Sequence, residues 1–312
     1  MACPGGAWFR FRLGFAEGVC LTGGVNSAVF LAPAKINLFL AITDRRADGF
    51  HNLVSLVAPL DWGDTLRAEL APGAAGDVLS CDVPGLACDG SNLIVQAAQR
   101  FREATGWRDP VRFHLGKRIP MGAGLGGGSS DATSALLALN ELAGAPLTRE
   151  QLVALAAQVG SDCALFMEGA PVVMRGRGER VSGLPDAAVA RIRGRRVLAF
   201  KPGFGIATPW AYKQLAARAP GSYLPAEAAE ARLAEWLGDG ARPLEKLLFN
   251  NMEGPAFEKY LALPTLLSTL SDDFGLSPLM SGSGSACFAL LPDSYAVEGV
   301  VAAIRAAWGP GA

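Results

Sequence analysis

The most informative segment of the sequence is Pro120-Met121-Gly122-Ala123-Gly124-Leu125-Gly126-Gly127-Gly128-Ser129-Ser130-Asp131-Ala132. Five of the eleven residues from Pro120 to Ser130 are glycine. Glycine lets the backbone adopt positive φ and approach a ligand closely, so that successive N–H groups can point inward. A helix follows, because apolar residues recur at i, i+3, i+4 and i+7 in Ala132, Ala135, Leu136 and Leu139. Its N-terminus adds partial positive charge, and the stretch therefore predicts a phosphate-binding loop.

Two other phosphate-binding patterns fit this loop poorly. A Walker A motif ends in Gly-Lys-Ser/Thr, whereas this loop ends in Gly128-Ser129-Ser130 without a lysine. The spacing of Gly122, Gly124 and Gly127 formally matches the dinucleotide fingerprint, but any loop this rich in glycine contains that match. Asp131, at the helix start, can cap the helix or hold a cation. Just before the loop, Lys117 and Arg118 either neutralise phosphate or end a strand in solvent.

The composition excludes several classes of protein. The chain has 312 residues, of which 50% are hydrophobic and 18% are charged, so two domains with substantial cores are expected. A formal net charge of −1 gives no indication of a nucleic-acid or membrane-surface partner. Six scattered cysteines without a C-x-x-C pair, and two histidines, argue against a zinc site and favour a reducing compartment. Without a transmembrane run or a signal peptide, the expected location is the cytoplasm, and oligomeric state stays open.

The chain pattern predicts strands and helices in both halves. Residues 1–24 are rich in glycine and are expected to be a poorly ordered extension, followed by domains over 25–190 and 191–312. The expected strands are 27–42, interrupted at Pro33-Ala34-Lys35, then 53–60, closed by a turn at 61–64, and 111–115, 172–174, 195–201, 277–281 and 285–291. The expected helices are 91–104, 132–139, one from the capping box of Thr148 and Gln151 to Gly160, and about 208–218, 225–237, 255–270 and 294–307.

The loop and several further segments together resemble the GHMP kinases. That family carries a Pro-x3-Gly-Leu-Gly-x-Ser-Ser-Ala loop between a strand and a helix, which Pro120 to Ala132 matches. The other similar segments are Pro33 to Leu38, Arg46 to His51, Gly160 to Cys163 and Met280 to Ser285. They follow the family's order over about residues 27 to 291. Phe50 stands where the family usually has tyrosine, and Ala164 stands where proline is common.

The resemblance implies both a fold and a reaction. The implied fold is α+β with two domains, the first like ribosomal protein S5 domain 2 and the second ferredoxin-like, with a nucleotide cleft between them. The segments are most similar to those of a branch that works in non-mevalonate isoprenoid synthesis. That similarity implies transfer of the γ-phosphate of ATP, with Mg²⁺, to the 2-hydroxyl of 4-diphosphocytidyl-2-C-methyl-D-erythritol. The alternatives are a homoserine or mevalonate-type kinase, a catalytically silent nucleotide sensor and, as a poor third, a dehydrogenase.

The same resemblance implies roles for individual residues. Asp162 is the expected general base, because the attacking hydroxyl must lose its proton. Lys35 lies in the apolar run 30–40, where a lysine is costly unless it is paired, and is expected to act beside Asp162. The expected ATP-binding residues are Pro120 to Ser130, and the expected substrate-binding residues are Asn37, Phe50 and His51.

Some expectations concern residues outside this core set. No side chain is identified as a metal ligand, although Ser129 or Ser130 can approach phosphate-bound Mg²⁺. Gly282 and Gly284 either let a second loop approach the site or form a hairpin turn. Cys163 is expected to be a small buried residue and not a nucleophile, and His114 is expected to be structural.

Overall fold

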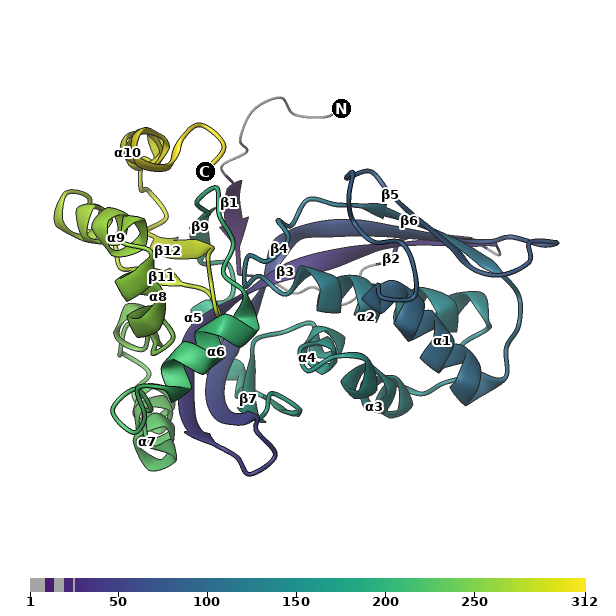
Figure 1. Ribbon diagram of the computed structural model, residues 1–312, viewed down its shortest axis with the longest axis horizontal. Coiled ribbons are helices and arrows are strands. Elements are labelled where there is room, and N and C mark those ends of the chain that lie inside the picture. Colours follow the sequence, from purple (N-terminus) through teal and green to yellow (C-terminus); the bar gives the residue numbers. More distant parts are fainter. Residues whose placement is uncertain (1–8, 14–19, 25) are drawn as a thin grey trace.

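The computed structural model describes every residue except 1–8, 14–19 and 25, and its strands form two sheets (Figure 1). The larger sheet has eight strands, with the order β10-β3-β4-β6-β5, β2 beside β3, and β7 between β4 and β8. The smaller sheet has the order β1-β9-β12-β11. The strands are β1 (Phe9–Arg12), β2 (Cys20–Gly24), β3 (Ser27–Arg45), β4 (His51–Leu70), β5 (Val78–Cys81), β6 (Val111–Gly116), β7 (Val172–Gly176), β8 (Arg180–Gly183), β9 (Arg196–Phe200), β10 (Phe249–Asn250), β11 (Pro278–Met280) and β12 (Cys287–Leu291).

Four helices cover one side of the larger sheet (Figure 1): α1 (Leu93–Thr105), α2 (Gly127–Leu142), α3 (Arg149–Val159) and α4 (Cys163–Glu168). The central helix is α2, in which every residue from Ser130 to Leu136 is buried, as are Ala138 and Leu139. The apolar residues among them include Ala132, Ala135, Leu136 and Leu139. These side chains pack with Phe101 and Phe113 into one apolar cluster. The stripe expected after the glycine loop is therefore a core stripe, and it anchors the start of α2 against the sheet.

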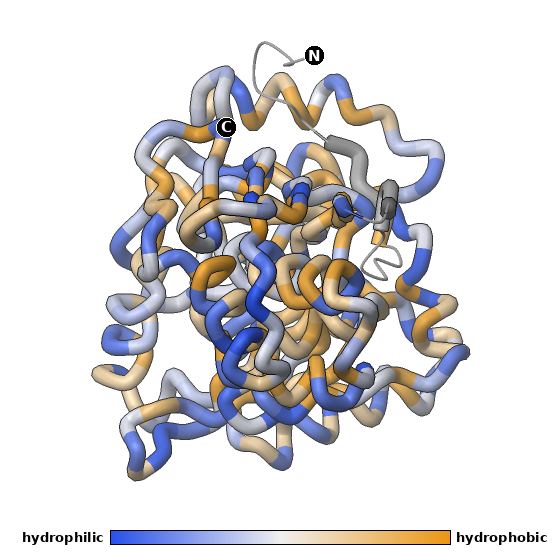
Figure 2. Tube along the Cα trace, turned by 90° about the vertical axis from the view of Figure 1, so that its right-hand side faces the viewer, coloured by the Kyte–Doolittle hydropathy of each residue, from blue (hydrophilic) through white to orange (hydrophobic). Residues whose placement is uncertain are grey.

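The remaining helices lie with the C-terminal half of the chain, and several pack on the smaller sheet (Figure 1). Leu198, Phe200, Cys287 and Ala289 of that sheet share an apolar cluster with these helices. In Figure 2 the trace changes colour repeatedly along the peripheral helices, as expected for elements that bury one face. The helices are α5 (Asp186–Ile192), α6 (Thr208–Ala216), α7 (Ala226–Gly238), the short 3-10 helix η1 (Leu244–Lys246), α8 (Glu253–Lys259), α9 (Ala262–Asp272) and α10 (Glu298–Trp308).

The two long strands β3 and β4 differ from the sequence-based expectation. β3 continues through Pro33-Ala34-Lys35 with only a register shift between Pro33 and Lys35. The turn expected at 61–64 is wrong, because β4 runs straight through it. Gly63 pairs with Pro33, and a Cβ on Gly63 would lie 2.0 Å from the Ala32 carbonyl oxygen. The glycine here permits close contact between two strands rather than a reversal of the chain.

Two further differences lie nearer the ends of the chain. The single helix expected over 255–270 is two helices, because Tyr260 at the end of α8 leaves the helical region (φ −114°, ψ 74°).

Within residues 1–24, β1 pairs with β9 and β2 pairs with β3, so these two segments gain regular structure from the edges of existing strands. The rest of the expected extension lies outside the described residues, and the domain boundary near 190 stays a prediction. None of the described helices is long and apolar enough to cross a membrane.

Candidate active site

A cavity of about 600 Å³ opens where the glycine loop, β3 and the residues before α4 meet. Lys35, Asn37 and Asp162 line it together with most of the loop. Three segments thus contribute to one site, and the outer two, which carry Lys35 and Asp162, are far apart in the sequence. The lining residues from the glycine loop are Pro120, Met121, Gly122, Ala123, Gly124, Leu125, Gly126, Gly127, Gly128 and Ser129. Ser130, also expected to bind ATP, is buried within the first turn of α2.

The glycine loop has the backbone that the sequence predicted. Gly122, Gly124 and Gly126 have φ values of 62°, 77° and 74°, which residues with a Cβ rarely adopt. Gly126 is also in close contact, since a Cβ there would lie 2.9 Å from Lys35 Cγ. α2 starts at Gly127, five residues before the stripe that indicated it, and so the loop leads directly into a helix N-terminus. The first N–H groups of a helix and its dipole favour an anion, so phosphate binding by this loop stays a prediction with a suitable backbone.

Lys35 and Asp162 form an ion pair inside this cavity. Lys35 Nζ lies 3.9 Å from Asp162 Oδ2, and the lysine side chain is only 6% exposed, against 35% for the aspartate. Burial lowers the pKa of Lys35, and the charge of Asp162 partly offsets this effect. The buried cation and the half-buried carboxylate thus face one space, which a hydroxyl group can enter from the cavity.

Asn37 fixes the lysine. Its Oδ1 accepts a hydrogen bond of 2.6 Å from Lys35 Nζ, and its Nδ2 donates to Ser55 Oγ at 3.0 Å. Ser55 Oγ in turn donates to the Phe39 carbonyl oxygen at 2.7 Å. Asn37 lines the cavity as expected, but both ends of its amide are bonded to the protein. Its arrangement supports positioning of Lys35, and contact with substrate stays a prediction.

The segment 281–286, between β11 and β12, reaches the same place from the second half of the chain. Ser281 Oγ donates to the Gly124 carbonyl oxygen at 3.1 Å and accepts from the Asn37 N–H at 3.4 Å. A Cβ on Gly282 would lie 3.4 Å from Lys35 Nζ. The two expectations for Gly282 and Gly284 are therefore both met, because the connection between two paired strands also approaches the site.

A half-buried carboxyl group, that of Glu253, supports this segment. Glu253, at the start of α8, accepts a hydrogen bond of 2.8 Å from the Met280 N–H. Burial raises the pKa of Glu253 to about 7, although the bond from Met280 acts in the opposite direction. Asn250 adds two bonds of 2.8 Å from its Nδ2 to the Met280 and Gly282 carbonyl oxygens. The position of the segment therefore depends on a group that titrates near neutrality.

Replacing Glu253 by glutamine is expected to flatten the pH dependence of stability. Because the folded pKa is about 7 and the ordinary value is 4.5, the folded chain binds more protons than the unfolded chain between these values. The free energy of unfolding therefore falls as pH rises through this window and levels off above it. Glutamine accepts the Met280 bond without a charge, so at pH 8 we expect Glu253→Gln to be more stable by about 1–3 kcal/mol.

Urea unfolding between pH 5 and 8 measures this difference. Glu227→Gln, an exposed glutamate at the start of α7, is the matched control and should keep the wild-type slope. A Glu253→Gln protein whose stability falls with pH as steeply as that of the wild type contradicts the assignment.

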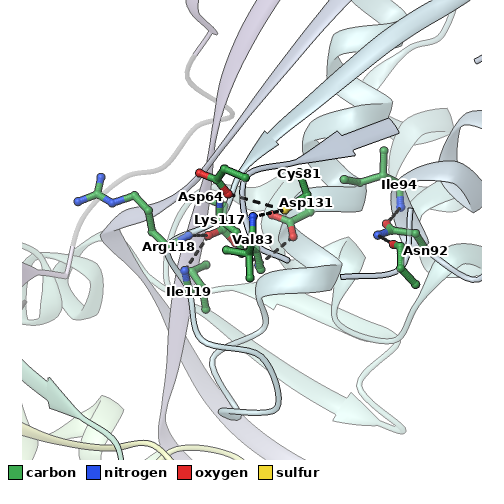
Figure 3. Close-up of polar contacts among 11 residues, drawn as sticks. Asp64, Cys81, Val83, Asn92, Ile94, Lys117, Arg118, Ile119 and Asp131 are labelled. Atoms are coloured by element: carbon green, nitrogen blue, oxygen red, sulfur yellow. Dashed lines mark hydrogen bonds and ion pairs between the residues drawn. The ribbon is translucent and has the colours of Figure 1, made fainter. Parts of the chain in front are cut away.

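Lys117 is not at a solvated strand end, because its side chain is buried and lines the first cavity, and contact with phosphate stays a prediction. Its ammonium forms ion pairs with Asp64 and with Asp131, the latter at 3.0 Å, and all three side chains are buried (Figure 3). Burial alone lowers the pKa of Lys117, but the charges of Asp131 and Asp64 outweigh it and raise the pKa. Asp64 also accepts the Ile119 N–H at 2.7 Å. This cluster fixes the chain between β6 and the glycine loop.

The sequence left open whether Asp131 caps α2 or holds a cation, and the structure excludes only the cap. Asp131 accepts no capping hydrogen bond from the N–H groups of α2, and its Oδ2 accepts one from Lys117 Nζ. Burial and the neighbouring charge of Asp64 raise its pKa well above the ordinary value. Its Oδ1 has no hydrogen-bond partner among the described residues, nor has the Ser130 hydroxyl.

A second cavity of about 920 Å³ adjoins the first and contains the expected substrate residues Phe50 and His51. Phe50 is 56% exposed, and its ring lies 4.9 Å from the Arg177 guanidinium carbon. His51 packs on Tyr212 with ring centroids 4.9 Å apart, and its Nε2 is 3.2 Å from the Tyr223 hydroxyl. Burial, followed by the charge of Arg45, lowers the pKa of His51. The structure thus gathers aromatic rings and a neutral hydrogen-bonding ring at one end of the site.

Several lining residues were missed from the sequence. Tyr212, Thr208 and Arg177 line both cavities, and residues 86–87 and 91–93 line the first one near the start of α1. Among these missed residues, only Asn92 has a local sequence feature, because it is the N-cap of α1 and its side chain accepts the Ile94 N–H (Figure 3). Tyr212 and Thr208 lie on an ordinary amphipathic helix, α6, so nothing in their spacing indicated a site.

The expectations for two other residues hold. Cys163 is fully buried, and burial raises the pKa of its thiol to about 12, so it is not a nucleophile. His114 lies on β6, where its Nδ1 is 3.0 Å from the Ser80 hydroxyl, and it lines neither cavity.

Comparison with known proteins places this geometry in a family. The family model "GHMP kinases N terminal domain" matches residues 92–172, and "GHMP kinases C terminal" matches residues 226–310. A 4-diphosphocytidyl-2-C-methyl-D-erythritol kinase from Synechococcus sp. (strain CC9311) is 39% identical over 84% of this chain and 86% of its own length. One from Methylacidiphilum infernorum (isolate V4) is 37% identical over 90% and 92%, respectively.

Similar solved structures include one of the same enzyme as these sequence relatives. A crystal structure of 4-(cytidine 5'-diphospho)-2C-methyl-D-erythritol kinase has a TM-score of 0.70 and 37% identity, covering 90% of this chain and 96% of that one. Homoserine kinase from Cytophaga hutchinsonii has a TM-score of 0.67 at 17% identity, with 93% and 92% covered, and shares the fold. The predicted α+β fold of two GHMP kinase domains is confirmed. The chain belongs to the 4-diphosphocytidyl-2-C-methyl-D-erythritol kinases, a family of ATP-dependent small-molecule kinases within the GHMP kinases.

Proposed function

We propose that this protein transfers the γ-phosphate of ATP to the 2-hydroxyl of 4-diphosphocytidyl-2-C-methyl-D-erythritol and so gives the 2-phosphate. The observation that carries this proposal is the Lys35–Asp162 pair, which faces the same cavity as the glycine loop. A phosphoryl donor held by the loop and an alcohol beside the pair would then be in line for transfer.

The glycine loop and the Lys35–Asp162 pair have separate roles in this proposal. N–H groups of the glycine loop and the start of α2 hold the phosphates of ATP, as expected for residues Pro120 to Ser130. Asp162 accepts the proton of the attacking hydroxyl, and Lys35 keeps the carboxylate charged and stabilises the oxygen as it loses its proton. Asn37 and the Ser281 segment hold Lys35 in place, so the cation does not need to reorient during transfer.

Mg²⁺ is proposed to accompany ATP. The described residues contain no cluster of three acidic, histidine or cysteine side chains suited to a metal ion. Magnesium in kinases is held largely by phosphates and water, with one or two carboxylates. Asp131 would be the carboxylate nearest the glycine loop, because it lines the cavity, and a bound cation would favour its charged form against the burial that raises its pKa. When bound, the ion neutralises charge on the phosphates.

The cytidyl end of the substrate is proposed to occupy the second cavity. Tyr212 and Phe50 offer faces for stacking on a base, and His51 offers a ring nitrogen for a hydrogen bond. Phe50 replaces the usual tyrosine and loses only a hydroxyl group. The cytoplasmic location, expected from the scattered cysteines and from the lack of a transmembrane run or signal peptide in the sequence, stays a prediction.

A panel of acceptor alcohols tests the function. Purified protein with ATP and Mg²⁺ should consume ATP with 4-diphosphocytidyl-2-C-methyl-D-erythritol and not with homoserine or mevalonate. Turnover only of alcohols without a cytidyl group would replace this proposal by another GHMP kinase activity. ATP binding without turnover of any alcohol would indicate a nucleotide sensor.

A further inference from the structure

The boundary between the two cavities carries an unassigned positive charge. Four residues line both cavities, namely Ser161, Arg177, Thr208 and Tyr212. Among these four, only Arg177 is charged. Lys35 and Lys117 line the first cavity alone, and Arg45 and Lys213 line the second cavity alone.

The turn between β7 and β8 holds Arg177 at this boundary. Gly176 and Gly178, on either side of it, have φ values of 69° and 108°. A Cβ on Gly178 would lie 3.0 Å from Met174 Cε and 3.8 Å from the Ser161 carbonyl oxygen, so the turn is packed against the residue before Asp162. The Arg177 N–H donates to Glu179 Oε2 at 2.5 Å, which closes the turn.

The guanidinium group itself is available to a ligand. It lies over the exposed ring of Phe50, with its carbon 4.9 Å from the ring centroid. The ion pairs formed by the described residues do not include Arg177. Its charge interacts with the carboxylates of Glu179 and Asp48, but neither forms an ion pair with it within 4 Å. A guanidinium group presents several donors in one plane and can bind two phosphate oxygens at once.

The proposed substrate brings an anion to this point. Its alcohol must reach Asp162 in the first cavity, and its cytosine is proposed to lie beside His51 in the second. The diphosphate that joins the two halves must therefore cross the boundary between the cavities. We propose that Arg177 is a substrate-binding residue that binds this diphosphate and selects acceptor alcohols that carry it, an inference that rests on the proposed function.

Two variants test this role. We expect Arg177→Met to weaken the binding of cytidine diphosphate at least about tenfold, because the charge-assisted hydrogen bonds are lost. Binding of cytidine, which has no phosphate, should stay within about twofold of wild type, and Arg177→Lys should restore part of the loss. Arg180→Met is the matched control, since Arg180 is exposed on the same hairpin and lines neither cavity.

Isothermal titration with these two ligands, together with steady-state kinetics, separates the outcomes. The expected kinetic result is a raised KM for the cytidyl substrate with an unchanged KM for ATP. A raised KM for ATP alone would place Arg177 on the triphosphate and overturn the inference, as would equal loss of cytidine and cytidine diphosphate binding. Normal kinetics in Arg177→Met overturns this inference while the proposed function stands, whereas a wild-type protein that neither binds cytidine diphosphate nor turns over the cytidyl substrate overturns both.

Discussion

Asp162→Asn is expected to lower kcat for the cytidyl substrate by about 10²–10⁴, with little change in the KM for ATP. The amide has nearly the same shape as the carboxylate, but it cannot accept the hydroxyl proton. Since Asp162 is 35% exposed and its ion pair with Lys35 is 3.9 Å long, its loss should cost little stability. Steady-state kinetics at saturating ATP measures the effect, and thermal unfolding shows whether the protein is intact.

The choice of control separates loss of the base from loss of charge in general. Asp186→Asn removes an exposed carboxylate at the start of α5, outside both cavities, and should leave kcat unchanged. Asp162→Asn protein that is folded and retains near-full turnover would show that the carboxylate is not the base. Proton transfer from the substrate would then have to be assigned to another group in the cavity.

The local signals in the sequence were sufficient for the glycine loop and for most helices. Positive φ at Gly122, Gly124 and Gly126 is a property of glycine itself, and the capping box of Thr148 and Gln151 is present as expected. These features depend on residues close together in the chain. The pairing of Lys35 with Asp162 joins residues far apart, and it was predictable only because the surrounding segments resemble a known family.

The features that sequence analysis missed depend on long-range packing. Asp61-Trp62-Gly63-Asp64 has the composition of a turn, yet Asp64 is buried because the Ile119 N–H and the Lys117 ammonium both need an acceptor there. Arg177 lies in a glycine-rich turn of ordinary appearance, and only the cavities on either side of it give it significance. No local pattern encodes either relationship.

Gly124→Ala is expected to destabilise the protein by about 3 kcal/mol or more and to abolish measurable ATP turnover. A Cβ at this position would lie 2.2 Å from the Ser281 carbonyl oxygen and 3.1 Å from the Gly284 backbone nitrogen. Both are main-chain atoms held by paired strands, so neither can move aside as a flexible side chain would. The loop must then separate from residues 281–284, which takes away the bond from Ser281 to Gly124 and leaves Asn37 and Lys35 without support on that side.

Gly122→Ala isolates this contact from the strain of the backbone. Gly122 has a similar φ of 62° in the same loop, but a Cβ there meets nothing within 4 Å. Both variants therefore share the cost of placing alanine at positive φ, about 1–2 kcal/mol, and only Gly124→Ala adds the collision. Urea unfolding and ATP turnover of the two variants should differ widely. If they lose stability and activity equally, close packing of the glycine loop on residues 281–284 does not hold the site together, and backbone conformation alone explains the glycines.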